Sequence, residues 1–205
     1  MFSVRMHGRG GQGVVTAAEL LSVAAFSEGR HAQAFPTFGS ERTGAPVVSF
    51  CRIDDRPIRL REPISEPDAV VVQDPTLLHQ VAVFDGLGPA GYLLVNTVKD
   101  LATLNIDEAL ARLDSGRVVA VPATELAREH LGRPLPNAAL LGAFAALTGQ
   151  VRLEAVLDAI RGRFPDALGE ANSRAARAAH DLVRAQIRAQ IGAQVGAQVG
   201  RRSHA

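Results

Sequence analysis

Three runs of consecutive apolar residues, each closed by a polar residue or a proline, constrain the fold of this chain more than any other feature. Residues 69–74 read AVVVQD, residues 91–96 read GYLLVN, and residues 117–122 read RVVAVP. Strands this short and this uniformly apolar are buried on both faces, which is typical of a largely parallel sheet covered by helices. Residues 2–7 and 46–53 are also apolar or rich in β-branched residues, so the sequence predicts five strands.

Helical periodicity fills the intervals between these strands. In residues 13–28, Val14, Leu21 and several alanines recur on one helical stripe, and the small residues allow close packing on a sheet. Strands that alternate with helices indicate an α/β fold. Residues 31–45 carry no period, which predicts an irregular loop insertion after the first helix. Further helices are predicted at residues 106–113, 123–131, 138–148 and 153–164.

The C-terminal residues differ in character from the rest. From Arg184 the chain reads RAQIRAQIGAQVGAQV, a tandem four-residue repeat. Four residues turn a helix by roughly 400°, so the Ile/Val stripe drifts by about 40° per repeat and leaves any flat face. We predict a C-terminal helix from about residue 172 to 191 that frays beyond, with one α/β domain at 1–183 and a low-complexity tail at 184–205. A partner-binding helix is the alternative interpretation of the tail.

The composition argues against several function classes. With 205 residues, 47% of them hydrophobic, the chain is long enough for one substantial core. Its net charge of +1 lacks the excess typical of nucleic-acid binders, and all its basic side chains except Lys99 are arginine. No apolar run is long enough to cross a bilayer, and the first residues lack a signal-peptide pattern. Its single cysteine, Cys51, excludes a disulfide framework and an iron–sulfur cluster held by this chain alone. We therefore expect a cytoplasmic protein that binds no nucleic acid and spans no membrane.

The stretch HGRGGQG at residues 7–13 lies between a predicted strand and a predicted helix. A helix start offers unpaired amides and a favourable dipole to an anion, and glycines let a ligand approach the main chain. Arg9 and Gln12 would add polar contacts. However, no acidic residue closes a second strand about 20 residues further on, as dinucleotide-binding folds require, and the Walker Lys-Ser/Thr pair is missing. A glycine turn needed only for packing is the alternative.

A second unusual stretch, AFPTFGSERTGAP at residues 34–46, is too rich in glycine, proline and phenylalanine for a plain linker. Glu41 and Arg42 are adjacent and so point in different directions, which suits one residue that bonds inward and a neighbour that reaches a partner. A surface loop with a solvated ion pair is the other interpretation.

The two stretches together carry a family resemblance. GRGGQGVVTAAELL followed by AFPTFGSERTGAPV resembles the gamma subunit, or gamma domain, of the 2-oxoacid:acceptor oxidoreductases, the pyruvate:ferredoxin oxidoreductase family. The likeness continues through PDAVVVQDP, LLVNT, VPAT, PNAALLG and GEAN, in the family's order, over about residues 3 to 180. One departure is Thr43, where the family commonly has arginine.

The resemblance implies an accessory subunit of a larger enzyme. Enzymes of that family decarboxylate a 2-oxoacid oxidatively, transfer the acyl group to coenzyme A and pass the electrons to ferredoxin or another acceptor. In multi-subunit members thiamine diphosphate and magnesium lie between the alpha and beta subunits, and 4Fe–4S clusters lie on a ferredoxin-like delta subunit. Where the acceptor is NAD, a further subunit with FAD is implied.

For this chain the resemblance implies no catalytic residue, no metal site and no cofactor held by the chain alone. It places the gamma subunit against the other subunits, near the approach of coenzyme A. The candidate residues for contact with coenzyme A phosphates or with a neighbouring subunit are Gly8, Arg9, Gly10, Gly11, Gln12 and Gly13, together with Ser40, Glu41 and Arg42.

An alternative function is a free-standing nucleotide-binding α/β protein that uses HGRGGQG as a phosphate loop. His7 could serve as a base beside that loop, but a structural hydrogen bond is the preferred interpretation. Cys51 lies within a predicted strand and is interpreted as a small buried apolar residue.

Overall fold

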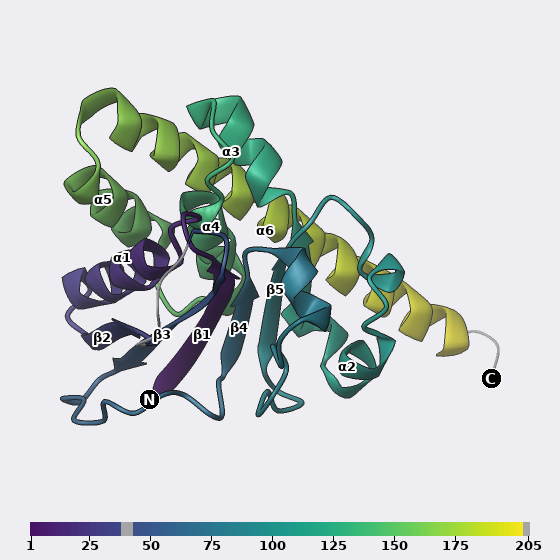
Figure 1. Cartoon of the computed structure of the whole chain (residues 1–205). Coiled ribbons are helices and arrows are strands. Elements are labelled where there is room, and N and C mark those ends of the chain that lie inside the picture. The colour runs from purple at the N-terminus through teal and green to yellow at the C-terminus, as the bar shows by residue number, and fades with distance from the viewer. Residues whose placement is uncertain (38–42, 203–205) are drawn as a thin grey trace.

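A computed structural model of the chain describes residues 1–37 and 43–202, with side chains for residues 1–37 and 43–192. Its centre is a six-stranded sheet in the order β2-β3-β1-β4-β5-β6 (Figure 1). Strands β1, β4, β5 and β6 are parallel, whereas β3 pairs antiparallel with both β1 and β2. The strands are β1 (Phe2–Arg9), β2 (His31–Pro36), β3 (Pro46–Asp54), β4 (Ala69–Val72), β5 (Tyr92–Asn96) and β6 (Val118–Val121).

Helices cover both faces of this sheet, as the apolar strands predicted. One face carries the larger core, which includes Met6, Leu21, Leu94 and Phe144 and lies under α1, α3, α4, α5 and α6. The other face carries a smaller core around Val72, under α2 and the short 3-10 helices. The helices are α1 (Val14–Ser27), α2 (Asp107–Arg112), α3 (Ala123–Leu131), α4 (Asn137–Thr148), α5 (Leu153–Arg163) and α6 (Asp166–Arg202), with η1 (Pro75–His79), η2 (Leu101–Thr103) and η3 (Ser115–Arg117).

The α/β fold with a mainly parallel sheet is confirmed, but the region after the first helix differs from the prediction. Instead of an irregular loop throughout, His31–Pro36 forms the edge strand β2, in register with β3. The alternating residues Ala32 and Ala34 face the core, and they are too small and too few to show as a strand pattern. Pairing with β3 stabilises this strand, which is a long-range contact that local sequence does not report.

The C-terminal helix is longer than predicted at both ends. It begins at Asp166 rather than at about residue 172 and extends to Arg202 rather than ending at about 191. Within the predicted range, Ile187 packs against the larger core and the Gln186 side chain donates to the Ala120 carbonyl at 3.2 Å. The outward-facing Ala120 carbonyl belongs to the edge strand β6, so the first repeat of the tail covers an open sheet edge.

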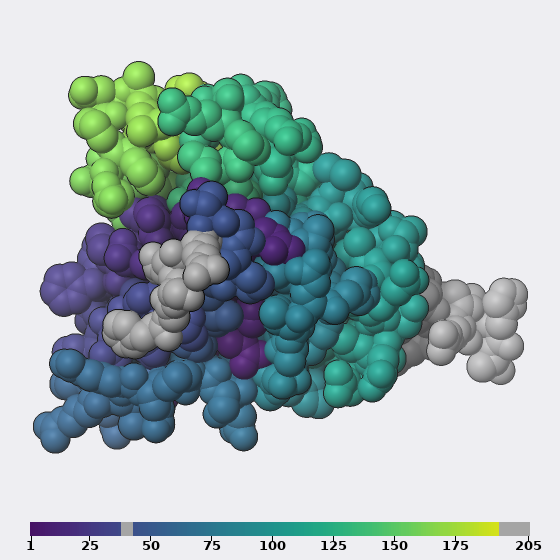
Figure 2. All heavy atoms as spheres, viewed as in Figure 1, coloured from purple at the N-terminus to yellow at the C-terminus, as the bar shows by residue number. Residues whose placement is uncertain are grey.

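The segment between β3 and β4, residues 55–68, runs along the lower border of the molecule in Figures 1 and 2. The buried side chain of Arg5 holds this segment against β1. Arg5 is 7% exposed, and its guanidinium donates to the carbonyls of Ile64 at 3.2 Å and Val83 at 3.1 Å. Carbonyl partners therefore satisfy a buried cation, and the same group ties two loops to β1.

Within residues 1–37 and 43–202, no helix has both the length and the apolar character that crossing a bilayer requires.

The contact between α4 and α6 generates a stability prediction. A Cβ added at Gly142 would overlap the Ala176 carbonyl group of α6, whereas a Cβ at Gly162 in α5 would meet open space. Gly142→Ala should therefore lower the free energy of unfolding by about 1–3 kcal/mol through overpacking. Gly162→Ala should raise it by up to about 1 kcal/mol, because alanine favours the helix. Urea unfolding of the two variants measures both; equal effects would contradict the close approach.

Candidate functional site

The glycine loop lies at the point where the connections of the sheet change direction. From β1 the chain passes through α1 to β2 and β3 on one side, and from β4 it passes through η1 to β5 on the other. In open α/β sheets, ligands bind outside the carboxyl ends of the strands at such a switch point. The loop after β1 carries Gly10–Gly13, and Gln73 and Asp74 follow β4.

The glycines of this loop have identifiable roles. Gly11 and Gly13 have φ angles of +92° and +73°, a region that favours glycine. A Cβ at Gly8 would lie 2.5 Å from Val14 Cγ2, so Gly8 permits α1 to pack closely against β1. Gly10 donates its amide to the Ala45 carbonyl at 2.9 Å, which joins the loop to the start of β3.

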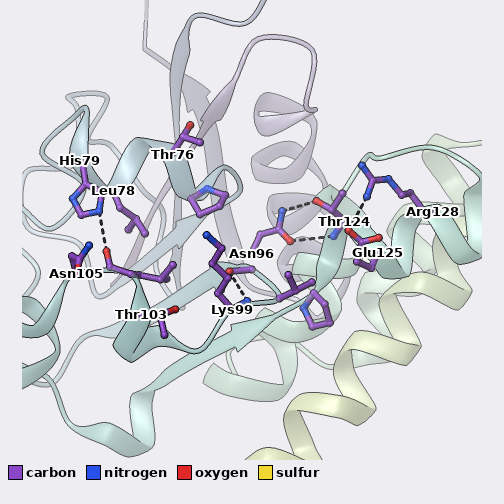
Figure 3. A pocket seen from close by; sticks show the side chains of 15 residues that line it. Thr76, Leu78, His79, Asn96, Lys99, Thr103, Asn105, Thr124, Glu125 and Arg128 are labelled. Atoms are coloured by element: carbon purple, nitrogen blue, oxygen red, sulfur yellow. Dashed lines mark hydrogen bonds and ion pairs between the residues drawn. The ribbon is translucent and has the colours of Figure 1, made fainter.

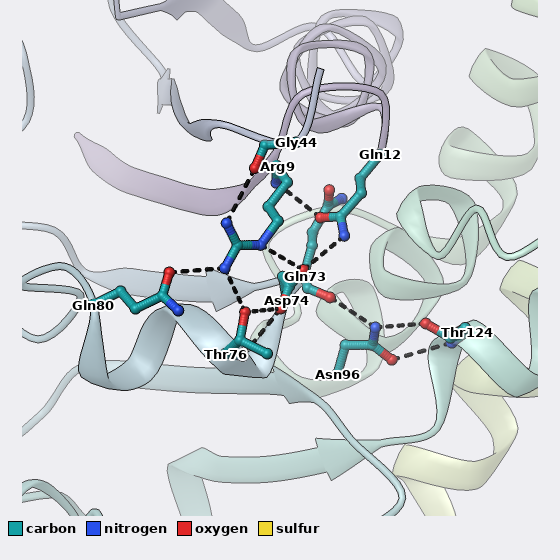
Figure 4. A network of polar contacts seen from close by, with 9 residues as sticks. All are labelled: Arg9, Gln12, Gly44, Gln73, Asp74, Thr76, Gln80, Asn96 and Thr124. Atoms are coloured by element: carbon teal, nitrogen blue, oxygen red, sulfur yellow. Dashed lines mark hydrogen bonds and ion pairs between the residues drawn. The ribbon is translucent and has the colours of Figure 1, made fainter. Parts of the chain in front are cut away.

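The Arg9 side chain is held by four hydrogen bonds (Figure 4). Its Nε donates to Asp74 Oδ2 at 3.1 Å, and Nη1 donates to the Gly44 carbonyl at 3.0 Å. Nη2 donates to Thr76 Oγ1 at 2.6 Å and to Gln80 Oε1 at 2.8 Å. One guanidinium therefore joins the ends of β1 and β4 to η1 and to the segment before β3.

Gln12 completes this network, which we call the Arg9–Asp74 network (Arg9, Gln12, Asp74 and Thr76). Its amide nitrogen donates to Asp74 Oδ2 at 2.9 Å, and its amide oxygen accepts from the Arg9 main chain at 2.8 Å. Partial burial raises the pKa of Asp74, but hydrogen bonds from Thr76 and Gln12 and the charge of Arg9 outweigh this effect. The pKa of Asp74 thus lies below its usual value, and the carboxylate is ionised at neutral pH.

The network changes what the loop offers to a ligand. The two polar side chains that the sequence suggested for an anion, Arg9 and Gln12, are both bound to Asp74. The Gly10 and Gln12 amides are bonded within the protein, but α1 starts at Gly13 without a side-chain cap, and a cavity of about 430 Å³ adjoins the loop. This cavity is lined by Arg9, Gly10, Gly11, Gly13, Val14, Val15, Thr43 and Val47.

The other predicted residues, Ser40, Glu41 and Arg42, lie outside the described residues. The structure describes the chain directly after them. Thr43 pairs with Gly10 in an isolated β-bridge, and Gly44 donates its amide to the Gly10 carbonyl at 3.1 Å. This end of the segment is therefore bound to the glycine loop.

Sequence reasoning missed the polar residues that close β4 and β5. Gln73 is 1% exposed, and neither atom of its amide has a hydrogen-bond partner among the described residues. Its main-chain carbonyl accepts from Asn96 Nδ2 at 2.7 Å. The signal was present, because Gln73, Asp74 and Asn96 are the polar residues that end the apolar runs AVVVQD and GYLLVN.

A second cavity, of about 490 Å³, lies at the carboxyl ends of β4, β5 and β6 (Figure 3). It shares no lining residue with the cavity at the glycine loop. Its lining includes His79, Lys99, Thr124 and Arg128, none of which the sequence had singled out as a site.

Comparison with known proteins identifies the family. The family model described as pyruvate ferredoxin/flavodoxin oxidoreductase matches residues 3–182. The chain belongs to this family.

Relatives refine this assignment. The chain is 52% identical over 181 residues to the pyruvate/ketoisovalerate oxidoreductases common subunit gamma of Thermococcus kodakarensis, with 87% of this chain and 95% of the relative covered. It is 49% identical over 182 residues to pyruvate synthase subunit PorC of Methanocaldococcus jannaschii, with coverages of 88% and 96%. The crystal structure of pyruvate oxidoreductase subunit PORC from Thermotoga maritima superposes with a TM-score of 0.74 at 40% identity, covering 88% of this chain and 95% of that one.

The predicted resemblance to gamma subunits of 2-oxoacid:ferredoxin oxidoreductases is confirmed by these matches. They give no support to the alternative of a free-standing nucleotide-binding protein.

His7, next to the loop, and Cys51, in the middle of β3, have structural roles. His7 accepts a hydrogen bond from Arg5 Nε through its Nε2 at 3.1 Å, which confirms the structural interpretation. Burial, and then the charge of Arg5, lowers the pKa of His7 to about 4. Burial raises the pKa of Cys51 to about 12, so this fully buried thiol stays protonated. Among the residues that the structure describes, no three His, Cys, Asp or Glu side chains are grouped to hold a metal ion.

The Arg9–Asp74 network generates a stability prediction with a matched control. Asp74 caps η1 and Asp100 caps η2 in the same way, but only Asp74 also accepts from Arg9 and Gln12. Asparagine preserves both caps, so Asp100→Asn should change the free energy of unfolding by less than about 0.5 kcal/mol. Asp74→Asn should cost about 1–3 kcal/mol at neutral pH, through the charged hydrogen bonds. Urea unfolding measures both variants. Equal losses in the free energy of unfolding would show that the hydrogen bonds from Arg9 and Gln12 do not stabilise the protein.

His7 generates a pH prediction. The folded protein keeps His7 neutral down to a pKa of about 4, whereas the unfolded chain protonates it near pH 6.5. Stability is therefore fully present above the unfolded pKa and is lost as the pH falls from there toward 4. Between about pH 7.5 and pH 5 this group should account for a loss of about 2 kcal/mol. Urea unfolding at both pH values should show a smaller loss in His7→Gln, and an unchanged loss would assign the effect elsewhere.

Proposed function

We propose that this chain is the gamma subunit of a complex that oxidatively decarboxylates a 2-oxoacid with coenzyme A and passes the electrons to ferredoxin, or to NAD through a further flavin subunit. Its proposed partners are the alpha, beta and ferredoxin-like delta subunits. The observation that carries the proposal is the family match over residues 3–182, together with full-length relatives that are gamma or PorC subunits.

The reacting groups of the complex belong, in this proposal, to the partner chains. Thiamine diphosphate supplies carbanion chemistry and iron–sulfur clusters carry electrons. The described part of this chain has no grouping of metal ligands, and its one cysteine is buried and protonated. The chain therefore contributes positioning and contact surface.

The glycine loop is the proposed contribution to coenzyme A binding and subunit contact. The cavity at the loop is lined by main chain of Gly10, Gly11 and Gly13, and α1 starts there without a side-chain cap. Unpaired amides at a helix start suit a phosphate group, so the start of α1 fits the phosphates of coenzyme A, while the Gly10 amide is bonded to Ala45 and holds the loop in place. Arg9 holds the loop in place through its bonds to Asp74 and Gly44. In this proposal the main chain of the loop makes the contact with the phosphate.

Selection of the oxoacid is assigned to other chains. One relative at 52% identity is named as a gamma subunit common to pyruvate and ketoisovalerate oxidoreductases, and another at 49% is a pyruvate synthase subunit. A subunit shared between two such enzymes cannot itself distinguish their substrates. We infer that this chain likewise leaves the choice of oxoacid to its partners.

Copurification tests the complex. The natively expressed chain, tagged at its N-terminus, should bring down chains that carry thiamine diphosphate and iron–sulfur clusters, with coenzyme A-dependent oxoacid oxidation in the eluate. Cofactor absorbance and mass spectrometry of the eluate measure this. Recovery of the intact chain alone from a native extract would refute the proposal.

A matched pair of variants tests the loop. Gly11 and Gly29 have φ angles of +92° and +80°, and a Cβ at either meets no atom within 4 Å. Asparagine adopts positive φ more readily than most residues, so each variant adds one side chain without overlap and with a similar backbone strain. Gly11→Asn should weaken assembly or raise the KM for coenzyme A severalfold, whereas Gly29→Asn, at the far end of α1, should leave both unchanged. An unaffected Gly11→Asn complex would remove the loop from the proposal while leaving the copurification result intact.

A further inference from the structure

The cavity at the ends of β4, β5 and β6 has the features of a second binding site. Its 490 Å³ volume is lined by residues from η1, from the chain after β5 and from the start of α3. In Figure 3 the Lys99 side chain lies between His79 and Asn105 on one side and Asn96 and Thr124 on the other. This site is separate from the glycine loop and does not depend on its proposed role.

Lys99 supplies the uncompensated charge of this lining. Arg128 forms an ion pair with Glu125 at 2.7 Å, so these two charges balance each other. Within residues 1–37 and 43–192, no ion pair joins Lys99 to a carboxylate. His79 bonds through Nε2 to the Leu104 carbonyl at 2.9 Å and is thereby engaged.

Asn96 orients the Thr124 hydroxyl group so that its proton is free to donate a hydrogen bond. Its Nδ2 donates to Thr124 Oγ1 at 2.8 Å, and its Oδ1 accepts from the Thr124 amide at 3.1 Å. Because Thr124 Oγ1 already accepts at that point, its proton is directed elsewhere. Thr97 is in the same condition: it is 9% exposed, and its Oγ1 accepts from the Lys99 amide at 3.0 Å. Two hydroxyl donors therefore accompany the ammonium group.

The start of α3 adds main-chain donors. Its N-cap residue, Pro122, supplies no side-chain cap, although Asn96 occupies the Thr124 amide. The remaining amides of the first turn and the helix dipole favour negative charge. Ammonium, hydroxyl and amide donors therefore all line this cavity.

We propose that this cavity binds an oxyanion group, phosphate or carboxylate, of a small molecule. Lys99 is its charge partner, and Thr97, Thr124 and the first turn of α3 are its hydrogen-bond donors. Asn96 is a positioning residue that acts through Thr124. An ammonium group and a helix start are established means of holding phosphate, and hydroxyls from two further positions surround the anion.

Titration of the full chain tests this site. The ¹⁵N-labelled protein is titrated separately with inorganic phosphate and with acetate, and amide shifts are followed by NMR. We expect saturable shifts at Lys99 and Thr124 with a dissociation constant of about 10 mM or tighter. Saturation with phosphate alone identifies a phosphate-bearing ligand, and saturation with acetate alone or with both identifies carboxylate as an accepted group.

Variants of Lys99 separate specific from general charge effects. Lys99→Gln should weaken binding about tenfold or more, since a charged hydrogen bond is lost, whereas Lys99→Arg should retain most of it. The control is Arg59→Gln, which removes an exposed charge outside both cavities and should leave affinity unchanged. The proposal is overturned by non-saturable shifts, by an equal loss in Arg59→Gln, or by shifts at residues 10–13 in place of Thr124.

Discussion

The ion pair between Arg9 and Asp74 is the contact on which the arrangement of the loop end of this protein depends. It joins the last residue of β1 to the residue that caps η1, at 3.1 Å, across 65 positions of sequence. Through the same guanidinium, Gly44 and Gln80 are fixed as well. Both partners are mostly shielded from water, with 23% and 14% of their side chains exposed. Solvent therefore screens this ion pair less than it screens a fully exposed one.

Because of this interaction, the side chains and the main chain of the glycine loop have different roles. The side chains of Arg9 and Gln12 bond to Asp74 and hold the loop in position, while Gly10, Gly11 and Gly13 line the adjoining cavity. Polar atoms pre-set in this way need little reorganisation when a ligand or a partner arrives. A similar arrangement lies beside it, where the Asn96 side chain makes three hydrogen bonds and orients Thr124 at the second cavity.

Close packing of the helices and strands, together with buried hydrogen bonds, supports these loops. Gly142 brings α4 and α6 into main-chain contact, and Gly8 lets α1 lie close to β1. On the opposite face Arg5 ties two loops to the same strand, with His7 kept neutral as its acceptor. Buried polar side chains such as Arg5 and Asn96 therefore hold loops in place.

The sequence by itself determined the parallel strands, the helices between them, the glycine turn and the family, because each depends on residues close together in the chain. Uniform apolar runs such as AVVVQD require cover on both faces, and the glycines of GRGGQG permit the left-handed backbone that the structure has at Gly11 and Gly13. Only the tertiary structure decided that the Arg9 side chain bonds to Asp74 and that His31–Pro36 pairs with β3. It also decided that Lys99 and Thr124 line the same cavity. These outcomes depend on strand order and on the direction of each side chain, which arise when segments distant in sequence pack together.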